Sequence, residues 1–329
     1  MTVEKNELSQ NSMGGTEQMA ERINRDLPPD LLKDFQIIPS RVRNLDETKI
    51  RVLYCHDLPD DPESKHLENE GWRKFHKIVF VSYWQRDWYI RKFNIPYSHT
   101  VVIQNAITPI ETKKKKPSKK INMIYHTTPH RGLHILVPVF EKLAEKHKDI
   151  HLDVYSSFAI YGWEKRDEPY MKLFDYIKEH PQMTYHGYRP NEDVRKALVD
   201  THIYAYPNTW METSCLSLIE AMSAEVLCVH PDYGALPETA ANWTLMYPYD
   251  EDPQRHAGVF YNVLDSAVDI IKSKDESSMV KLKGAKSYCD LYYNWEVKKH
   301  QWEAFLNSIK DLPRKIEEPK GNMFVYRSG

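Results

Sequence analysis

Glu212 and Glu220 lie eight residues apart in the segment YPNTWMETSCLSLIEAMSAE, which spans residues 206–225. A strand is expected to end near Tyr206, a polar loop carries Glu212, and a helix expected from Ser214 carries Glu220 two turns along. Backbone N–H groups at the start of such a helix bind anions such as a diphosphate. Glu220 stands among apolar residues, where a carboxylate is costly unless it is paired or bound to a ligand. We therefore predict an anion site, with Glu220 suited to accept hydrogen bonds from a ribose diol.

A second polar segment, YHTTPHRGLHIL at residues 125–136, also follows an apolar strand. Arg131 and Gly132 lead into a helix, and a cation beside a helix N-terminus can hold a diphosphate and stabilise charge on a departing nucleotide. A plainer interpretation is open for both segments. Arg131 would then face solvent, Glu212 would only favour the helix dipole, and Glu220 would be an ordinary helix residue.

Together the two segments resemble the retaining glycosyltransferases of family 4, whose signature is a pair of glutamates with seven residues between them. Glu212 and Glu220 match that signature, and the EAM tripeptide that begins at Glu220 also matches. The resemblance implies that Glu212 lies at the transferred sugar, that Glu220 binds the ribose of the donor nucleotide, and that Arg131 acts on the diphosphate. Glu225 departs from the family, which usually has glycine a few residues after the signature.

Other segments extend the resemblance. Gly14 and Gly15 look like a family loop that lines the cleft at the phosphate and the acceptor, and glycine allows close backbone approach. His56 follows an apolar strand, in a region where relatives have a histidine that hydrogen-bonds the donor sugar. The remaining residues of the implied donor site lie in loops and at a helix start, namely Thr127, Thr128, Tyr188, Thr213, Ser214 and Cys215.

Short apolar strands alternate with helical segments on both sides of a lysine-rich stretch, TKKKKPSKK at 112–120. Such alternation predicts an α/β protein with parallel sheets, and the resemblance makes this the GT-B fold, two Rossmann-like domains facing across a cleft. We expect an acceptor-side domain over 1–111, a solvated linker over 112–120, a nucleotide-sugar-binding domain over 121–290, and a helix over 291–329 that crosses back. The first domain is expected to be reduced, because the polar segment 1–11 precedes the glycine loop where relatives have a strand.

The local patterns also place individual elements. Ser82 is a suitable N-cap for a helix over 83–93, and apolar residues spaced by three, four and seven predict a helix face over 295–309. Further helices are expected at 16–25, 133–147, 168–179, 192–199, 214–223 and 258–274. Strands are expected at 36–42, 50–55, 77–81, 100–103, 121–125, 151–155, 183–186, 203–206, 226–230 and 243–247.

Composition limits the cellular compartment and the classes of binding partner that are expected. The formal net charge is −2, without the basic excess of a protein that binds nucleic acid through phosphates. Four scattered cysteines and a polar N-terminus with no signal-peptide core indicate a reduced, cytoplasmic setting, and no apolar run is long enough to span a membrane. A second interpretation of the lysine-rich stretch is weak peripheral contact with anionic lipid.

We therefore predict transfer of a sugar from an NDP-sugar, with UDP or GDP as the nucleotide, to a glycan or another hydroxyl acceptor, with retention at the anomeric carbon. No cofactor is expected, and no D-x-D carboxylate pair stands at a site suited to Mg²⁺ or Mn²⁺. The alternatives are a sugar-nucleotide epimerase or a phosphorylase on the same fold, or a non-catalytic nucleotide-sugar-binding protein. The sugar, the acceptor and the oligomeric state are left open.

Overall fold

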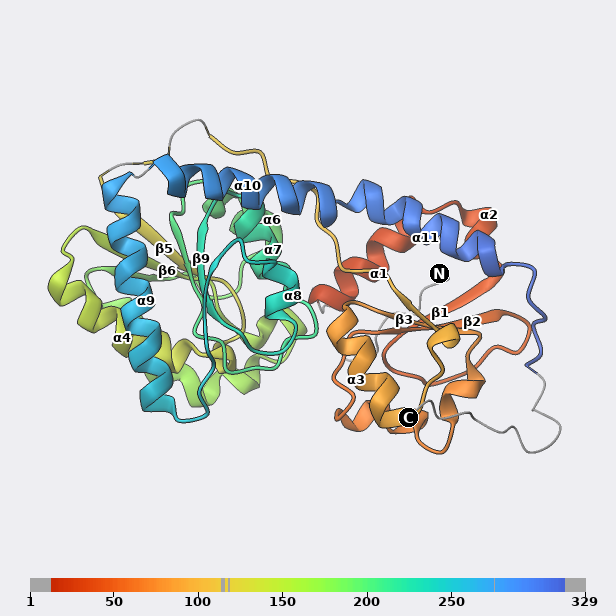
Figure 1. Ribbon diagram of the computed structural model, residues 1–329. Helices are drawn as coiled ribbons and strands as arrows, with labels where there is room; N and C mark the ends of the chain where they lie inside the picture. Colours follow the sequence, from red (N-terminus) through yellow and green to blue (C-terminus); the bar gives the residue numbers. More distant parts are fainter. Residues whose placement is uncertain (1–12, 114–115, 118, 275, 317–329) are drawn as a thin grey trace, which may run out of the picture.

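The computed structural model describes residues 13–113, 116–117, 119–274 and 276–316, which form two parallel sheets with helices on their faces (Figure 1). The described strands lie in the order β1-β2-β3-β4 in one sheet and β10-β9-β8-β5-β6-β7 in the other. Every neighbouring pair in both sheets is parallel. This arrangement confirms the predicted α/β class.

The first sheet is buried on both faces, as is usual for parallel strands. Side chains of β2 alternate between two cores: Tyr54 packs with α1 and α11 on one face, and Leu53 packs with α3 on the other. The elements of this half are α1 Gly15–Asp26, α2 Pro29–Leu32, β1 Phe35–Pro39, β2 Ile50–Cys55, β3 Lys77–Phe80, α3 Tyr83–Phe93 and β4 Thr100–Val102.

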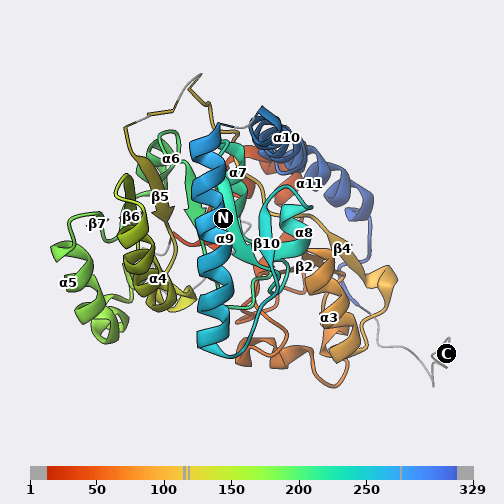
Figure 2. The same ribbon diagram turned by 60° about the vertical axis from the view of Figure 1, so that its left-hand side comes forward.

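The second sheet forms one continuous core with its helices. Helices α4 and α9 lie side by side on one face of this sheet (Figure 2). Its strands are β5 Ile121–Tyr125, β6 Ile150–Val154, β7 Met183–Tyr185, β8 Ile203–Ala205, β9 Leu227–Pro231 and β10 Leu245–Tyr247. Its helices are α4 Leu133–Lys146, α5 Met171–Glu179, α6 Asn191–Leu198, α7 Leu216–Ser223, α8 Leu236–Ala240 and α9 Pro253–Ser273.

Two C-terminal helices run along one side of the molecule, α10 (Glu276–Tyr292) over the second sheet and α11 (Trp295–Ile309) over the first (Figure 1). The apolar face predicted over 295–309 is confirmed, since it packs in the core of the first sheet. Trp302 lies edge-on against Tyr54 at 5.0 Å between ring centroids, and the Trp295 indole N–H donates to Asp26 at 2.6 Å. The domain bounds themselves stay a prediction.

Several element boundaries differ from those expected, each for a local reason. The first strand ends at Pro39 rather than at residue 42, because Ser40 has a φ of +59°. Residues Glu164–Tyr170 form a 3₁₀ helix that contains Pro169, so the helix expected from 168 starts at Met171. The helix expected from 258 begins at Pro253, where the Asp252 carboxylate caps it. Helices α8 and α10 were not predicted.

The lysine-rich stretch is not wholly a solvated linker. The Lys116 ammonium donates to the carbonyl oxygens of Thr201 at 2.5 Å and of Ala224 at 2.9 Å, and Lys113 pairs with Asp200 at 2.6 Å. These contacts fasten the stretch to the loops before β8 and β9. They correct the expectation for Lys116, whereas the Lys113 side chain is 57% exposed. Residues 114, 115 and 118, and the polar segment 1–11, lie outside the described residues.

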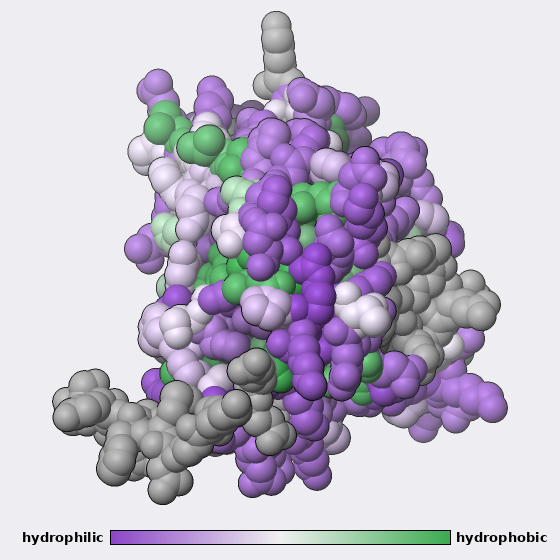
Figure 3. Space-filling view, turned by 90° about the vertical axis from the view of Figure 1, so that its right-hand side faces the viewer, coloured by the Kyte–Doolittle hydropathy of each residue, from purple (hydrophilic) through white to green (hydrophobic). Residues whose placement is uncertain are grey.

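The surface is mainly polar. On the face shown in Figure 3, hydrophobic areas are small and interrupted by hydrophilic side chains, as expected for the outer surface of an α/β protein. No helix within the described residues combines the length and the apolar character needed to cross a membrane.

Replacement of the fully buried Trp302 by alanine tests how strongly α11 is held. We expect Trp302→Ala to lower the free energy of unfolding by about 3–5 kcal/mol, because it removes a large core side chain and leaves a cavity. Leu291→Ala is the matched control, since Leu291 is 72% exposed and its loss should change stability by less than about 0.5 kcal/mol. Chemical denaturation measures both, and equal shifts would contradict the packing described.

Candidate functional site

The loops that follow β5 and β8 meet at the carboxyl edge of the second sheet, the edge at which open α/β sheets bind ligands. The β5 loop carries a short 3₁₀ helix, Pro129–Arg131, which ends at Gly132 before α4 begins. Gly132 has a φ of +111°, and an added Cβ would lie 2.1 Å from the carbonyl oxygen of Pro207 in the β8 loop. Only glycine therefore lets the two loops pack backbone to backbone and brings Arg131 to the β8 loop.

Glu212 in the β8 loop forms an ion pair with Arg131, and the hydroxyl of Tyr206 donates to the same carboxylate oxygen at 2.5 Å. Glu212 is only 4% exposed. Burial alone would lower the pKa of Arg131, but the charge of Glu212 raises it well above its usual value. Arg131 is thus a permanent cation beside a buried carboxylate, and the second oxygen of Glu212 has no hydrogen bond to a described residue.

A further loop holds the backbone of Glu212 in place. Residues 233–235 follow β9, and Glu212 forms an isolated bridge with Gly234 while its carbonyl oxygen accepts from the Ala235 N–H at 2.8 Å. The carboxylate is therefore fixed by its backbone as well as by Arg131 and Tyr206.

Buried polar atoms without a protein partner gather on the loops after β2, β5 and β6. Leaving such an atom unpaired costs about 1–3 kcal/mol, so a concentration of them indicates a place where a ligand or solvent completes the hydrogen bonds. Among the described residues they include His56 Nε2, Asp57 Oδ2, His126 Nε2, Thr128 Oγ1, His130 Nδ1, Arg131 Nε and Ser156 Oγ. The loop after β5 belongs to the segment 125–136 selected from the sequence, and the loop after β2 begins at His56.

His56 connects the two halves of the molecule. Its carbonyl oxygen accepts from the Thr213 hydroxyl at 2.8 Å, and its ring lies edge-on against Tyr54 at 4.2 Å between centroids. Burial lowers the pKa of His56 to about 3, so the imidazole is neutral at physiological pH. A neutral imidazole with a free Nε2 can donate a hydrogen bond to a ligand or accept one, depending on its tautomer.

The glycine loop also reaches the second half. Helix α1 begins at Gly15, and the N–H of Met13 donates to the carbonyl oxygen of Ile160 at 2.8 Å. An added Cβ on Gly14 would lie 2.5 Å from the ring of Tyr161, so this position accepts no side chain without displacing the ring. The loop therefore lies against the segment that follows β6.

Glu220 is buried in α7 and already has protein partners. Its carboxylate accepts from Arg195 at 3.0 Å and from the Asn191 amide at 3.0 Å, and both come from α6. Burial raises the pKa of Glu220, and the charge of Arg195 acts against that effect. The requirement that an acid at this position be paired or ligand-bound is thus met by Arg195, and the role of Glu220 toward a ribose stays a prediction.

The other predicted donor residues are spread around this edge. Cys215 is the residue before α7 and is buried, and Ser214 lies in the loop before it. Thr128 is buried after β5, with Thr127 beside it. Tyr188 is 36% exposed in the loop after β7, and the contacts between described residues do not join it to Arg131 or Glu212.

Three further residues belong to the site by geometry and were not selected from the sequence. Tyr206, directly after β8, binds Glu212, and Arg195, in α6, binds Glu220. Tyr161 lies next to Gly14, and the charges of Arg131 and Glu212 act on its hydroxyl. The position of Tyr206 directly after a strand was the one available signal. Within the described ranges no cluster of three or more His, Cys, Asp or Glu side chains could hold a metal ion.

Comparison with known proteins identifies one family for the second half. Residues 106–257 match the family described as glycosyl transferases group 1. A search of curated proteins finds no match.

Solved structures show the fold of the whole chain. A glycosyltransferase from Rickettsia africae ESF-5 is 15% identical, with a TM-score of 0.67 over 91% of this chain and 81% of that one. Anabaena Alr3699/HepE, in complex with UDP-glucose, is 14% identical, with a TM-score of 0.62 over 84% and 79%. The pneumococcal O-GlcNAc transferase GtfA, in complex with UDP and GlcNAc, is 9% identical, with a TM-score of 0.64 over 90% and 60%. These similarities confirm the predicted GT-B fold.

The histidines of the site predict a pH dependence of the free energy of unfolding. Burial lowers the pKa of His126 to about 3, so below pH 6.5 the unfolded chain binds a proton that the folded chain excludes. Stability from this residue is present above pH 6.5 and is lost as the pH falls toward 3. His126→Gln should reduce the difference in bound protons between the two states by about one at pH 5.

The measurement is the free energy of unfolding from pH 7 to pH 5. His300→Gln is the control, because His300 lies on the surface of α11 with its side chain 73% exposed. A pH slope that is the same in His126→Gln and in the original protein would show that His126 is protonated in the folded state.

Proposed function

We propose that this chain, whose residues 106–257 match the group 1 glycosyl transferases, transfers a sugar with retention from a UDP-sugar that is held by the loops after β5 and β8. The ion pair of Arg131 with Glu212 carries the proposal. It places a permanent cation and an oriented carboxylate together at the ligand-binding edge of the sheet. The UDP in the similar structures of HepE and GtfA supports this choice of nucleotide.

Arg131 is proposed to stabilise the leaving diphosphate. One guanidinium nitrogen, Nη1, donates to Glu212, while Nε is buried without a partner. Other N–H groups of the guanidinium are therefore available to phosphate oxygens. Negative charge develops on the diphosphate as the bond to the sugar breaks, and a fixed cation in a buried site stabilises that charge strongly. The N–H groups at the start of α7, after Thr213, Ser214 and Cys215, would add to this effect.

Glu212 and His56 are proposed to position the transferred sugar. The Glu212 oxygen that has no hydrogen bond in the described residues can accept from a sugar hydroxyl, while Arg131 and Tyr206 hold the other oxygen. His56 is neutral, and its Nε2 can bond to a second hydroxyl. No residue is proposed as a covalent nucleophile.

Glu220 is proposed to accept hydrogen bonds from the ribose. A carboxylate offers about four acceptor positions, and Asn191 and Arg195 do not use all of them. Arg195 neutralises the buried charge, so the remaining positions can serve a ligand without the cost of an unpaired carboxylate. Tyr188, in the loop after β7, is proposed to lie near the base.

The acceptor is proposed to be a glycan or another hydroxyl compound, and the setting to be the cytoplasm. All four cysteines, Cys55, Cys215, Cys228 and Cys289, are free and buried, which supports a reducing environment.

The ribose contact is tested with Glu220→Ala. We expect the variant to bind UDP more weakly by about 1–3 kcal/mol, because the ribose hydroxyls lose a charged acceptor. Glu192→Ala is the control, since Glu192 is an exposed residue of the neighbouring α6 and, among the described residues, pairs with Lys196 alone. Calorimetry with UDP, GDP and ADP measures the affinities and tests the choice of base. Unchanged UDP affinity in a folded Glu220→Ala protein would remove Glu220 from the donor site.

The role of Arg131 is tested with Arg131→Gln and Arg131→Lys. The glutamine variant should lower kcat by about 100-fold or more, the usual effect of losing one fixed donor to a developing charge. The lysine variant keeps the charge and should retain part of the activity. Release of UDP from a UDP-sugar measures turnover, and equal rates in all three proteins would contradict the role. Conversion of the UDP-sugar without release of UDP would instead indicate an epimerase.

A further inference from the structure

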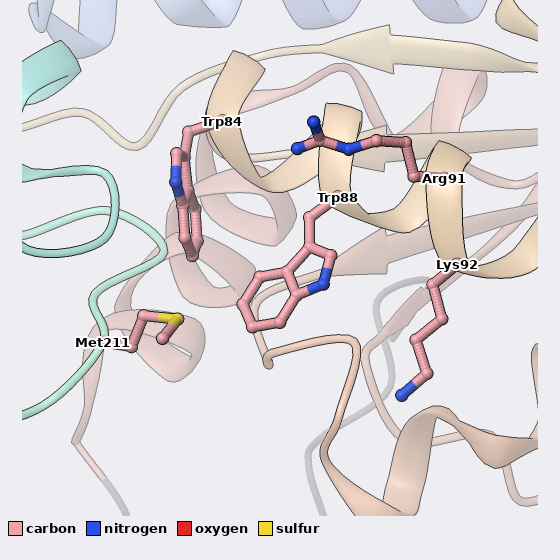
Figure 4. A pocket seen from close by; sticks show the side chains of 5 residues that line it. All are labelled: Trp84, Trp88, Arg91, Lys92 and Met211. Atoms are coloured by element: carbon pink, nitrogen blue, oxygen red, sulfur yellow. The ribbon is translucent and has the colours of Figure 1, made fainter.

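A groove lies between α3 and the β8 loop, beside the proposed donor site. It is a cavity of about 500 Å³ lined by Trp84, Trp88, Arg91, Lys92 and Met211 (Figure 4). The first three lie on one face of α3, because residues four and seven apart share a helix face. Met211 approaches them from the other half of the molecule and is the residue directly before Glu212. The groove is therefore bordered by the same loop, after β8, that carries Glu212.

The two halves are joined at this point. The Glu238 carboxylate accepts from the backbone N–H groups of Tyr83 and Trp84, both at 2.9 Å, and so binds the N-terminus of α3. Glu238 belongs to α8, in the second half, so this contact holds the tryptophan face of α3 against the β8 loop.

Trp84 and Trp88 form the aromatic wall of the groove. Their rings lie 5.2 Å apart between centroids at 71°, and Figure 4 shows both on the side that Met211 faces. Both are partly exposed, and neither indole N–H has a hydrogen bond to a described residue. Aromatic rings that combine an apolar face with an unused N–H suit a ligand that has both apolar C–H surfaces and hydroxyls, as a sugar ring does.

Arg91 gives the groove an unbalanced positive charge. It is exposed, and no ion pair or hydrogen bond joins its guanidinium to any described residue. In Figure 4 its side chain extends along α3 toward the two tryptophans, whereas Lys92 points away from them. The Lys92 ammonium is already paired with Asp60 and donates to the Pro59 carbonyl oxygen at 2.8 Å. Arg91 is therefore the cation left for a ligand, and its planar fork suits a carboxylate or a phosphate.

We propose that this groove binds the acceptor, and that the acceptor is an anionic saccharide whose ring packs on Trp84 and Trp88 while its acidic group pairs with Arg91. The inference rests on the proposed function. In that reaction an acceptor hydroxyl oxygen forms the new bond to the anomeric carbon, the bond from that carbon to the diphosphate breaks, and the hydroxyl proton leaves with UDP. Met211 and Glu212 are consecutive residues of the loop after β8, so the proposed acceptor groove and the proposed donor site share this loop.

Saturation-transfer NMR tests the groove with two probes, cellobiouronic acid and cellobiose, which differ only at C6 of one ring, a carboxylate in the first and a hydroxymethyl group in the second. We expect the acid to bind about ten-fold more tightly, the value of one charge-assisted hydrogen bond. Arg91→Gln should remove this preference, and Arg91→Lys should keep most of it. Trp88→Ala should weaken the binding of both saccharides. If Trp88→Ala does not fold, the two Arg91 variants still carry the test, because Arg91 is exposed.

Calorimetry with UDP separates this inference from the proposed function. UDP should bind Arg91→Gln as tightly as the original protein, because Arg91 lies outside the donor loops. Three results would contradict the proposal that this groove binds an anionic saccharide. They are equal affinity of the original protein for the two saccharides, no binding of either, and a preference for the acid that is unchanged in Arg91→Gln. Failure of the original protein to bind UDP would instead overturn the proposed donor site.

Discussion

The pairing of Arg131 with Glu212 organises the donor edge of the molecule. A carboxylate that is nearly inaccessible to water is costly unless an opposite charge and hydrogen-bond donors surround it. Arg131 comes from the loop after β5, and Tyr206 directly follows β8, so both loops must adopt one particular arrangement to satisfy Glu212. The close packing of Gly132 on Pro207 follows from the same requirement.

The second glutamate, Glu220, is also a buried carboxylate that is paired with an arginine, although the pair comes from other elements. Glu220 in α7 is paired with Arg195 from α6, and Arg195 also donates to the carbonyl oxygen of Thr108 at 2.7 Å. Each buried carboxylate is thus paired with an arginine from a neighbouring loop or helix. Two such pairs, whose carboxylates have unused acceptor positions, suit a ligand that carries both hydroxyls and phosphates.

The site also depends on how the two sheets meet. Thr213 bonds to His56, Glu238 caps α3, and Met13 bonds to Ile160, so loops from both halves contact one another at the same edge. Helix α11 packs on the first sheet although it follows a helix that packs on the second. The groove at Trp84 exists only because these contacts bring α3 to the β8 loop.

The sequence by itself determined the α/β class, the helix face over 295–309, and the glutamate and arginine segments that the structure brings together at Arg131 and Glu212. These follow from short-range patterns, because strand alternation, helix periodicity and the residues just after a strand can be read within a few turns of chain. Only the tertiary structure decided that Arg195 pairs with Glu220, that Lys116 is fastened to the loops before β8 and β9, and that Trp84 faces Met211. Each of these depends on burial and on contact between segments far apart in sequence, which no local pattern encodes.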